Sequence, residues 1–204
     1  MTVRQQSWRV GASVLFGTLV LVASCGSGGG VEGDGDAGER LTERLNVLAS
    51  HVESWRNAPS LAEAQRAAEA AANHVVGPDG PGFGDRDRDG EVRGPTDAGI
   101  LPGLEGAPAG FALEAVNAGA PDCVMRDILG GGWDDPARRW AELDNAIANW
   151  QPTRNTFPSL ASHAQRIVGW ATLTLATGSL EEARTYAGHA ELHIAISLGA
   201  LNDC

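Results

Sequence analysis

The chain has 204 residues, a length typical of one domain with tails, and its 43% of hydrophobic residues is enough for a single core. The formal net charge is −11, and all 15 of its Lys and Arg residues are Arg. Because these arginines form no basic cluster, the sequence predicts no nucleic-acid partner.

The N-terminus has the pattern of an export signal. Two arginines precede an apolar stretch over 10–23, which is short for a membrane span but fits the hydrophobic region of a secretory signal peptide. Residues 21–25 read Leu-Val-Ala-Ser-Cys, which resembles the lipobox of bacterial lipoproteins. The resemblance implies removal of residues 1–24 and attachment of lipid to Cys25, so that the protein is membrane-anchored on the extracytoplasmic side of a bacterial cell envelope. An ordinary signal peptide or a membrane-anchoring helix is the alternative.

The next stretch, residues 25–38, is rich in Gly and predicts a flexible tether to a helical domain at 39–204. Two cysteines remain besides the lipidated one, Cys123 and Cys204. An even number of cysteines in an oxidising compartment predicts one disulfide between them, with two free thiols as the alternative. Such a bond would close a long loop and contribute about 4 kcal/mol by the chain-entropy model.

Two amphipathic helices are predicted after the tether. Residues 39–56 carry one apolar stripe at alternating spacings of four and three: Leu41, Leu45, Leu48, Val52 and Trp55. A capping box from Ser60 to Glu63 predicts the start of the second helix, whose stripe consists mostly of Ala. Gly77-Pro78 is expected to end that helix.

The connection after the second helix contains an acidic pattern that suits a hard cation. Carboxylates at alternate positions are followed by a glycine and, after one spacer, by an apolar residue: Asp85, Asp87, Asp89, Gly90 and Val92. In a tight loop around an ion, alternate side chains turn inward, and the sharp turn at the sixth position favours glycine. This order resembles the calcium-binding loop of EF-hand and dockerin modules over about a dozen residues. The resemblance implies that the aspartates bind Ca²⁺ and that Val92 packs on an apolar surface.

Departures from the EF-hand pattern define the expected site more closely. Glu91 at position seven would give its backbone carbonyl, and Thr96 replaces the bidentate carboxylate of position twelve, so the loop would close one residue late through Asp97. Gly- and Pro-rich flanks replace the flanking helices. The arginines of the segment are expected to point outward and to offset part of its charge: Arg86, Arg88 and Arg93. We therefore expect weak binding of Ca²⁺, with a Kd on the order of 10⁻⁴ to 10⁻³ M, and a solvated acidic linker is the alternative.

The second half of the chain predicts more helices. Short helical pieces are expected at 111–116 and 121–129, and a longer helix after the cap Asp135-Pro136. Two further helices are expected over 159–177 and from the capping box that begins at Ser179. No strand pattern competes. The sequence therefore predicts an all-α bundle of about four to five helices, with the calcium loop in a long Gly/Pro-rich connection.

A second metal site is an alternative interpretation. His189 and His193 lie one helical turn apart and would allow a transition-metal or haem-binding bundle. No zinc-protease signature or Glu-x-x-His pair accompanies them, so a polar stripe beside the core is the favoured interpretation. His74 precedes the acidic loop and is expected either to bond the loop backbone or to pack in the core.

No spacing in the sequence predicts a catalytic set of nucleophile, base and orienting group. We therefore expect that the protein is not an enzyme, with an enzyme whose active site is unrecognised as the alternative. The favoured function is that of an exported, lipid-anchored, calcium-binding helical bundle with a binding or scaffolding role at the cell surface. The sequence does not name its protein or small-molecule partner.

Overall fold

The computed structural model of the protein describes residues 34–153 and 155–202. Across these residues the chain is helical and contains no strand, so the predicted all-α fold class is confirmed. The signal peptide, Cys25 and Cys204 lie outside the described residues, and so does the first part of the tether. Among the described residues, no helix combines the length and the apolar character that crossing a membrane requires.

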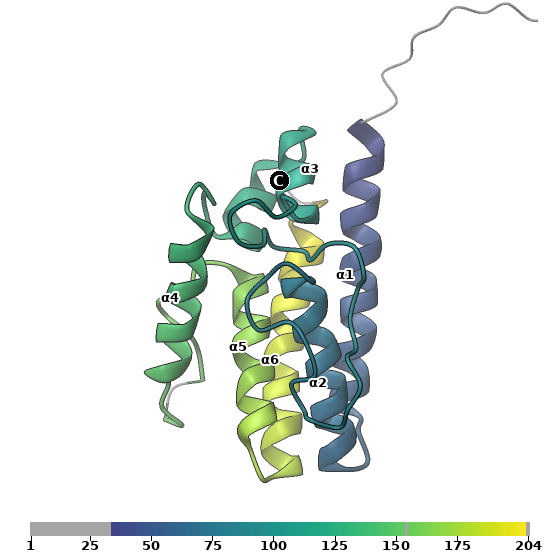
Figure 1. Ribbon diagram of the computed structural model, residues 1–204, viewed down its shortest axis with the longest axis vertical. Coiled ribbons are helices and arrows are strands. Elements are labelled where there is room, and N and C mark those ends of the chain that lie inside the picture. Colours follow the sequence, from purple (N-terminus) through teal and green to yellow (C-terminus); the bar gives the residue numbers. More distant parts are fainter. Residues whose placement is uncertain (1–33, 154, 203–204) are drawn as a thin grey trace, which may run out of the picture. The chain divides into compact units, whose positions relative to one another are not determined.

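Four long helices make up the bundle shown in Figure 1: α1 (Asp34–Arg56), α2 (Leu61–Val76), α5 (His163–Ala176) and α6 (Leu180–Gly199). Helix α1 packs on α2 and α6, α2 packs on α5, and α5 packs on α6, so that the four enclose one core. Helix α4 (Pro136–Ala148) packs mainly against α5, and its Arg139 donates a hydrogen bond to the carbonyl of Leu129 at 2.7 Å. The short helix α3 (Phe111–Asn117) and the π-helical segment η1 (Val124–Leu129) cover one end of the bundle.

The apolar stripe predicted for the first helix is buried. Its five residues are at most 1% exposed and belong to the main hydrophobic core. The helix begins earlier than predicted, because Asp34 to Gly38 of the expected tether already belong to α1. Ala37 lies one turn before Leu41 and is also buried, so the same stripe continues by a further turn and stabilises the helix there.

The second helix begins at its predicted cap. The Ser60 hydroxyl accepts a hydrogen bond from the backbone N–H of Glu63 and donates one to the Glu63 carboxylate. The helix ends at Gly77, which has a φ of 72° that favours glycine. A side chain at Gly77 would also meet the backbone of Gly99 at 2.2 Å. Gly77 and Gly99 of the long connection therefore lie against each other at the C-terminus of α2.

The start of α5 differs from its prediction. The helix begins at His163 rather than at residue 159, because the backbone N–H of Leu160 bonds the carbonyl of Phe157 in a turn. Ser162 caps the helix by accepting from the N–H of Gln165 at 3.0 Å, and its hydroxyl donates to the carbonyl of Ile128 at 2.6 Å. The cap thus also ties α5 to η1. The predicted cap at Ser179 is present at the start of α6.

Two helical glycines allow a matched test of core packing. An added Cβ at Gly169 in α5 would lie 2.8 Å from the ring of Phe157, which is buried against Trp170. At Gly188 in α6 nothing lies within 4 Å. We expect Gly169→Ala to lower the free energy of unfolding by about 1–3 kcal/mol through overpacking. Gly188→Ala should raise it by roughly 0.5–1 kcal/mol through helix propensity.

Urea unfolding followed by circular dichroism measures both free energies. Equal gains in the two variants would show that Phe157 does not fill the space beside Gly169.

Candidate metal centre

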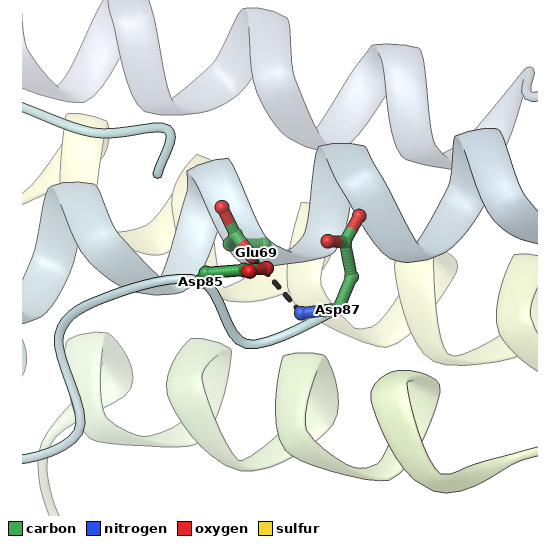
Figure 2. A group of neighbouring side chains, drawn as sticks. All are labelled: Glu69, Asp85 and Asp87. Atoms are coloured by element: carbon green, nitrogen blue, oxygen red, sulfur yellow. Dashed lines mark hydrogen bonds between the residues drawn. The ribbon is translucent and has the colours of Figure 1, made fainter. Parts of the chain in front are cut away.

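Three carboxylates from two segments meet beside α2. Glu69 comes from α2 itself, and Asp85 and Asp87 come from the acidic loop. One carboxylate oxygen of each lies within 4.8 Å of the other two (Figure 2). We call these residues the carboxylate group. Clustered carboxylate oxygens are the ligands that hard divalent cations prefer, and such an ion would offset the repulsion between their charges.

The three side chains of the carboxylate group differ in their exposure to solvent. Glu69 is fully buried and the side chain of Asp87 is 5% exposed, whereas Asp85 is exposed. A cation could therefore be held on one side by buried oxygens and retain water on the other. This combination is typical of sites that leave some coordination positions to solvent.

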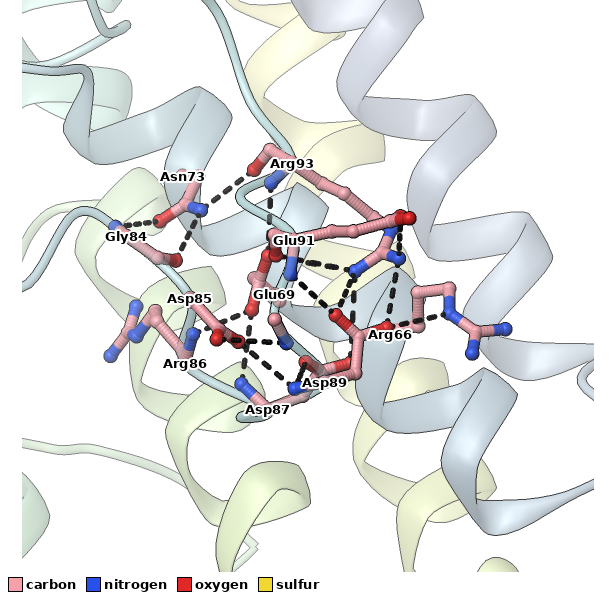
Figure 3. A network of polar contacts seen from close by, with 11 residues as sticks. Arg66, Glu69, Asn73, Gly84, Asp85, Arg86, Asp87, Asp89, Glu91 and Arg93 are labelled. Carbon is pink, nitrogen blue, oxygen red and sulfur yellow. Dashed lines mark hydrogen bonds and ion pairs between the residues drawn. The ribbon is translucent and has the colours of Figure 1, made fainter.

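Glu69 also holds the loop in place. Its Oε2 accepts hydrogen bonds from the backbone N–H groups of Arg86 and Asp87, and its Oε1 accepts one from Arg93 at 3.0 Å (Figure 3). A buried carboxylate needs such donors, because it has lost its hydration. The loop therefore satisfies Glu69, and Glu69 fixes the path of the loop.

Asn73, one turn further along α2, clamps the two ends of the same loop. It is fully buried, and its amide nitrogen donates to the carbonyls of Gly84 at 2.9 Å and Arg93 at 2.6 Å. Its side-chain oxygen accepts from the N–H of Gly84 at 3.3 Å. A single side chain thus joins residues on both sides of the acidic segment.

The loop aspartates also organise their own backbone. The Asp85 carboxylate accepts from the N–H groups of Asp89 at 3.1 Å and Gly90 at 3.0 Å. The Asp87 carboxylate accepts from Asp89 at 3.1 Å, and the Asp89 carboxylate accepts from Glu91 at 3.0 Å. Each carboxylate oxygen has two lone pairs, so these single bonds leave capacity for an ion.

Charge within the loop is balanced by Arg93. Its guanidinium lies 2.8 Å from the carboxylate of Asp89 and 2.6 Å from that of Glu91. It also lies 3.9 Å from Glu69 and 4.0 Å from Asp87. The hydrogen bond from Arg93 is the main reason that the pKa of Asp89 is lowered.

Asp87 has the opposite shift. Loss of solvent raises its pKa, and the charges of Glu69 and Asp89 raise it further, against a backbone hydrogen bond and Arg93. The ionised form of Asp87 is therefore disfavoured where it stands. A cation at the carboxylate group would remove that penalty.

The predicted ligands separate into three places. Asp85 and Asp87 join the carboxylate group. Asp89 pairs with Arg93 and with Arg66 of α2, and Glu91 pairs with Arg93. Asp97 pairs with Arg44 of α1. The structure therefore brings the first two together with Glu69 and places Asp97 against a different helix.

Two expectations about side-chain direction are wrong. Val92 is 56% exposed and does not pack on an apolar surface. Arg86 does not point outward, because its guanidinium is largely buried and donates to the Thr172 hydroxyl of α5 at 3.0 Å. Arg93 turns inward to the carboxylates, so Arg88 is the arginine of this segment that remains exposed, with a φ of 65°.

Glu69 and Asn73 were not predicted from the sequence as residues of the site. Both lie on α2 among buried alanines, four positions apart and beside the predicted stripe. Two polar residues one turn apart in a helix otherwise rich in Ala were a usable signal, because buried polar side chains need partners. The partner could not be read from the helix alone.

His189 and His193, one turn apart on α6, contact different groups. His189 stacks on Trp170 with ring centroids 4.4 Å apart, and the Nδ1 of His193 lies 2.9 Å from the Nδ1 of His163. His74 stacks on His51 at 4.7 Å, and its Nδ1 has no hydrogen-bond partner among the described residues. The expected bond from His74 to the loop backbone is therefore not formed through that atom.

Comparison with known protein families, with curated proteins and with solved structures finds no match for this chain. Cys123 is buried and disulfide-bonded, and because Cys204 lies outside the described residues, the pairing of these two cysteines stays a prediction.

Proposed function

We propose that this protein is an exported, lipid-anchored helical bundle that binds Ca²⁺ at the carboxylate group and serves a binding or scaffolding role at the bacterial cell surface. The observation that carries the calcium proposal is the meeting of buried Glu69 with Asp85 and Asp87. The alternating aspartates of the sequence support the choice of Ca²⁺, and the convergence of Asp85 and Asp87 on Glu69 supports a cation site.

The ligand chemistry favours a hard cation. All of the clustered ligand atoms are carboxylate oxygens, with no nitrogen or sulfur among them. Calcium takes six to eight oxygen ligands in flexible geometry, whereas Mg²⁺ demands a near-ideal octahedron. One carboxylate from α2 and two from the loop, with an exposed side, suit Ca²⁺ better, because water can complete its coordination. Few protein ligands and a nearby arginine favour a weak site, with a Kd on the order of 10⁻⁴ to 10⁻³ M.

An ion in this position would act on the loop more than on the bundle. The helices bury their own apolar stripes, whereas the loop is attached to α2 mainly through Glu69 and Asn73. Binding would add a further attachment, between Glu69 and the side chains of Asp85 and Asp87. Calcium would therefore make the exposed outer surface of the loop more rigid, which is the surface available to a partner.

The lipid anchor is the part of the proposal that rests on sequence alone. Cys25 follows the lipobox-like residues and precedes a glycine-rich stretch. In a bacterial host, Cys25→Ser should abolish labelling of the protein by a radioactive fatty acid. Labelling that survives this substitution would rule out attachment at Cys25.

Calcium should stabilise the folded protein by mass action. With Ca²⁺ at millimolar concentration and a Kd near 10⁻⁴ M, the gain is roughly 1.4 kcal/mol, which raises the melting temperature by a few degrees. Asp87→Asn should remove this calcium-dependent gain. In chelator it should change the free energy of unfolding little, because the ionised form of Asp87 is already disfavoured in the folded protein. Thermal melts in Ca²⁺, Mg²⁺ and chelator measure the effect.

Asp97→Asn is the matched control, since it removes one carboxylate from the same connection but outside the carboxylate group. It should keep the calcium response. Loss of the response in Asp97→Asn alone would place the ion in the EF-hand-like arrangement that closes through Asp97. Identical melts of the unaltered protein in all three buffers would exclude the calcium site.

Arg93 should compete with the ion. Its guanidinium occupies the acidic loop as an internal cation, and it contacts two members of the carboxylate group at 3.9–4.0 Å. Arg93→Gln should therefore bind Ca²⁺ more tightly, by roughly threefold to tenfold, because the net charge of the ligands becomes more negative and the competitor is gone. Isothermal titration calorimetry measures the change.

Arg88→Gln removes the same charge from the same loop at an exposed position. It should change the affinity less, since Arg88 has no ion-pair partner among the described residues. Equal tightening in both variants would mean that only long-range charge matters and that Arg93 does not compete directly.

A further inference from the structure

Two histidines from different helices face each other at the end of the bundle that η1 covers. His163 is the first residue of α5, and His193 lies in α6. Their Nδ1 atoms are 2.9 Å apart, with ring centroids 5.0 Å apart and ring planes tilted by 57°. His193 is 8% exposed and His163 is half-buried, so the pair is reachable from solvent on the His163 side.

The geometry aims two nitrogen lone pairs at one point. Two neutral imidazoles can approach in this way only if something electrophilic lies between the nitrogens, because the facing lone pairs repel. A single shared proton meets that need when one ring carries it on Nδ1 and the other accepts. A metal ion meets it as well, once both rings carry their proton on Nε2.

Protons do not compete strongly for this position. The pKa of both rings is lowered, to about 3 for His193, mainly by burial and in part by neighbouring charges that include Arg166. The imidazoles are therefore neutral at pH 7, which is the form that binds metals. Binding then requires only a change of tautomer in one ring and releases no net proton.

The surroundings select the kind of ion. Arg166 on α5 brings positive charge to the pair, and Asp127 on η1 is the acidic residue that opposes it at His163. Asp127 is itself paired with Arg126 at 2.7 Å. The charge of Arg166 opposes any cation, and a hard cation, which prefers oxygen ligands, has no imidazole bond to offset that repulsion. An ion with a strong preference for imidazole nitrogen, such as Zn²⁺, Ni²⁺ or Cu²⁺, gains two bonds.

We propose that His163 and His193 form a two-histidine site for a divalent transition-metal ion, with Zn²⁺ as the simplest case, and that the ion fastens α5 to α6. No third His, Cys, Asp or Glu of the described residues joins them, so water fills the other positions. Two nitrogens at about 2.0–2.1 Å from a tetrahedral ion lie roughly 3.4 Å apart. The rings must therefore separate by roughly 0.5 Å, which the half-buried His163 ring can provide.

The test uses ZnCl₂ at pH 7 with millimolar Ca²⁺ present, so that the carboxylate group does not contribute. Zinc should raise the melting temperature of the unaltered protein by a few degrees, and His163→Gln should lose that shift. His189→Gln is the matched control, because it removes an imidazole from the same helix one turn from His193 and should keep the shift. Circular dichroism verifies that both variants are folded.

A second measurement avoids substitution altogether. In protein labelled with ¹⁵N-histidine, Zn²⁺ should shift the Nδ1 resonances of His163 and His193 and leave those of His189 in place. The proposal is overturned if the unaltered protein shows no zinc response, if His163→Gln retains it, or if His189 Nδ1 shifts instead. The calcium response of the loop is measured separately, so failure of one site does not decide the other.

Discussion

A carboxylate that has lost its water must find hydrogen-bond donors, and Glu69 finds them in the backbone of one loop. The path of the acidic segment depends on this interaction. Without it, the N–H groups of Arg86, Asp87 and Arg93 would lose their acceptor, at a cost of roughly 1–3 kcal/mol for each group that stayed buried. Asn73 adds the second attachment, one turn away. The position of every other group at the candidate site follows from these two side chains.

The acidic loop carries its own counter-charge, and the choice of arginine matters. A guanidinium presents several N–H donors in a planar fork, so Arg93 can contact more than one carboxylate at once. A lysine would offer a single, strongly hydrated point charge there. Arg86 uses the same geometry differently, because its buried guanidinium reaches across to α5. The loop is thus linked to α2 by its backbone and by Asp89, and to α5 by the side chain of Arg86.

The elements that could be predicted are those whose pattern is local. The stripe of α1 and the caps at Ser60 and Ser179 depend on residues within a few positions of one another, and all are present. The start of α5 was predicted four residues early, because the turn from Phe157 to Leu160 precedes the helix and the cap Ser162 is held by Ile128 of another segment. The local pattern also does not predict the type of helix at η1, which was expected as an ordinary helical segment and is a π-helix.

The candidate site shows the same division. Alternating aspartates identified the loop, since their spacing is a local property. Their geometry could not be predicted, because Glu69 lies 16 residues before Asp85 in the sequence and its role depends on how the loop folds back on α2. The histidines show the same limit. Helical spacing pairs His189 with His193, whereas the packing of α5 on α6 pairs His193 with His163.

The approach of Gly77 to Gly99 has a topological consequence. The backbone leaves α2 and returns to the same point, where the N–H groups of Ile100 and Leu101 bond the carbonyls of His74 and Val75. The segment between the two glycines is therefore a loop whose ends lie side by side, so its length does not affect where the chain continues in the bundle. It can be regarded as an insertion into the helical bundle, and Glu69 and Asn73 of α2 are the residues that bind it. Changes in the length or the outer residues of this insertion would leave the packing of the helices unchanged, as long as the two glycines, Glu69 and Asn73 are kept.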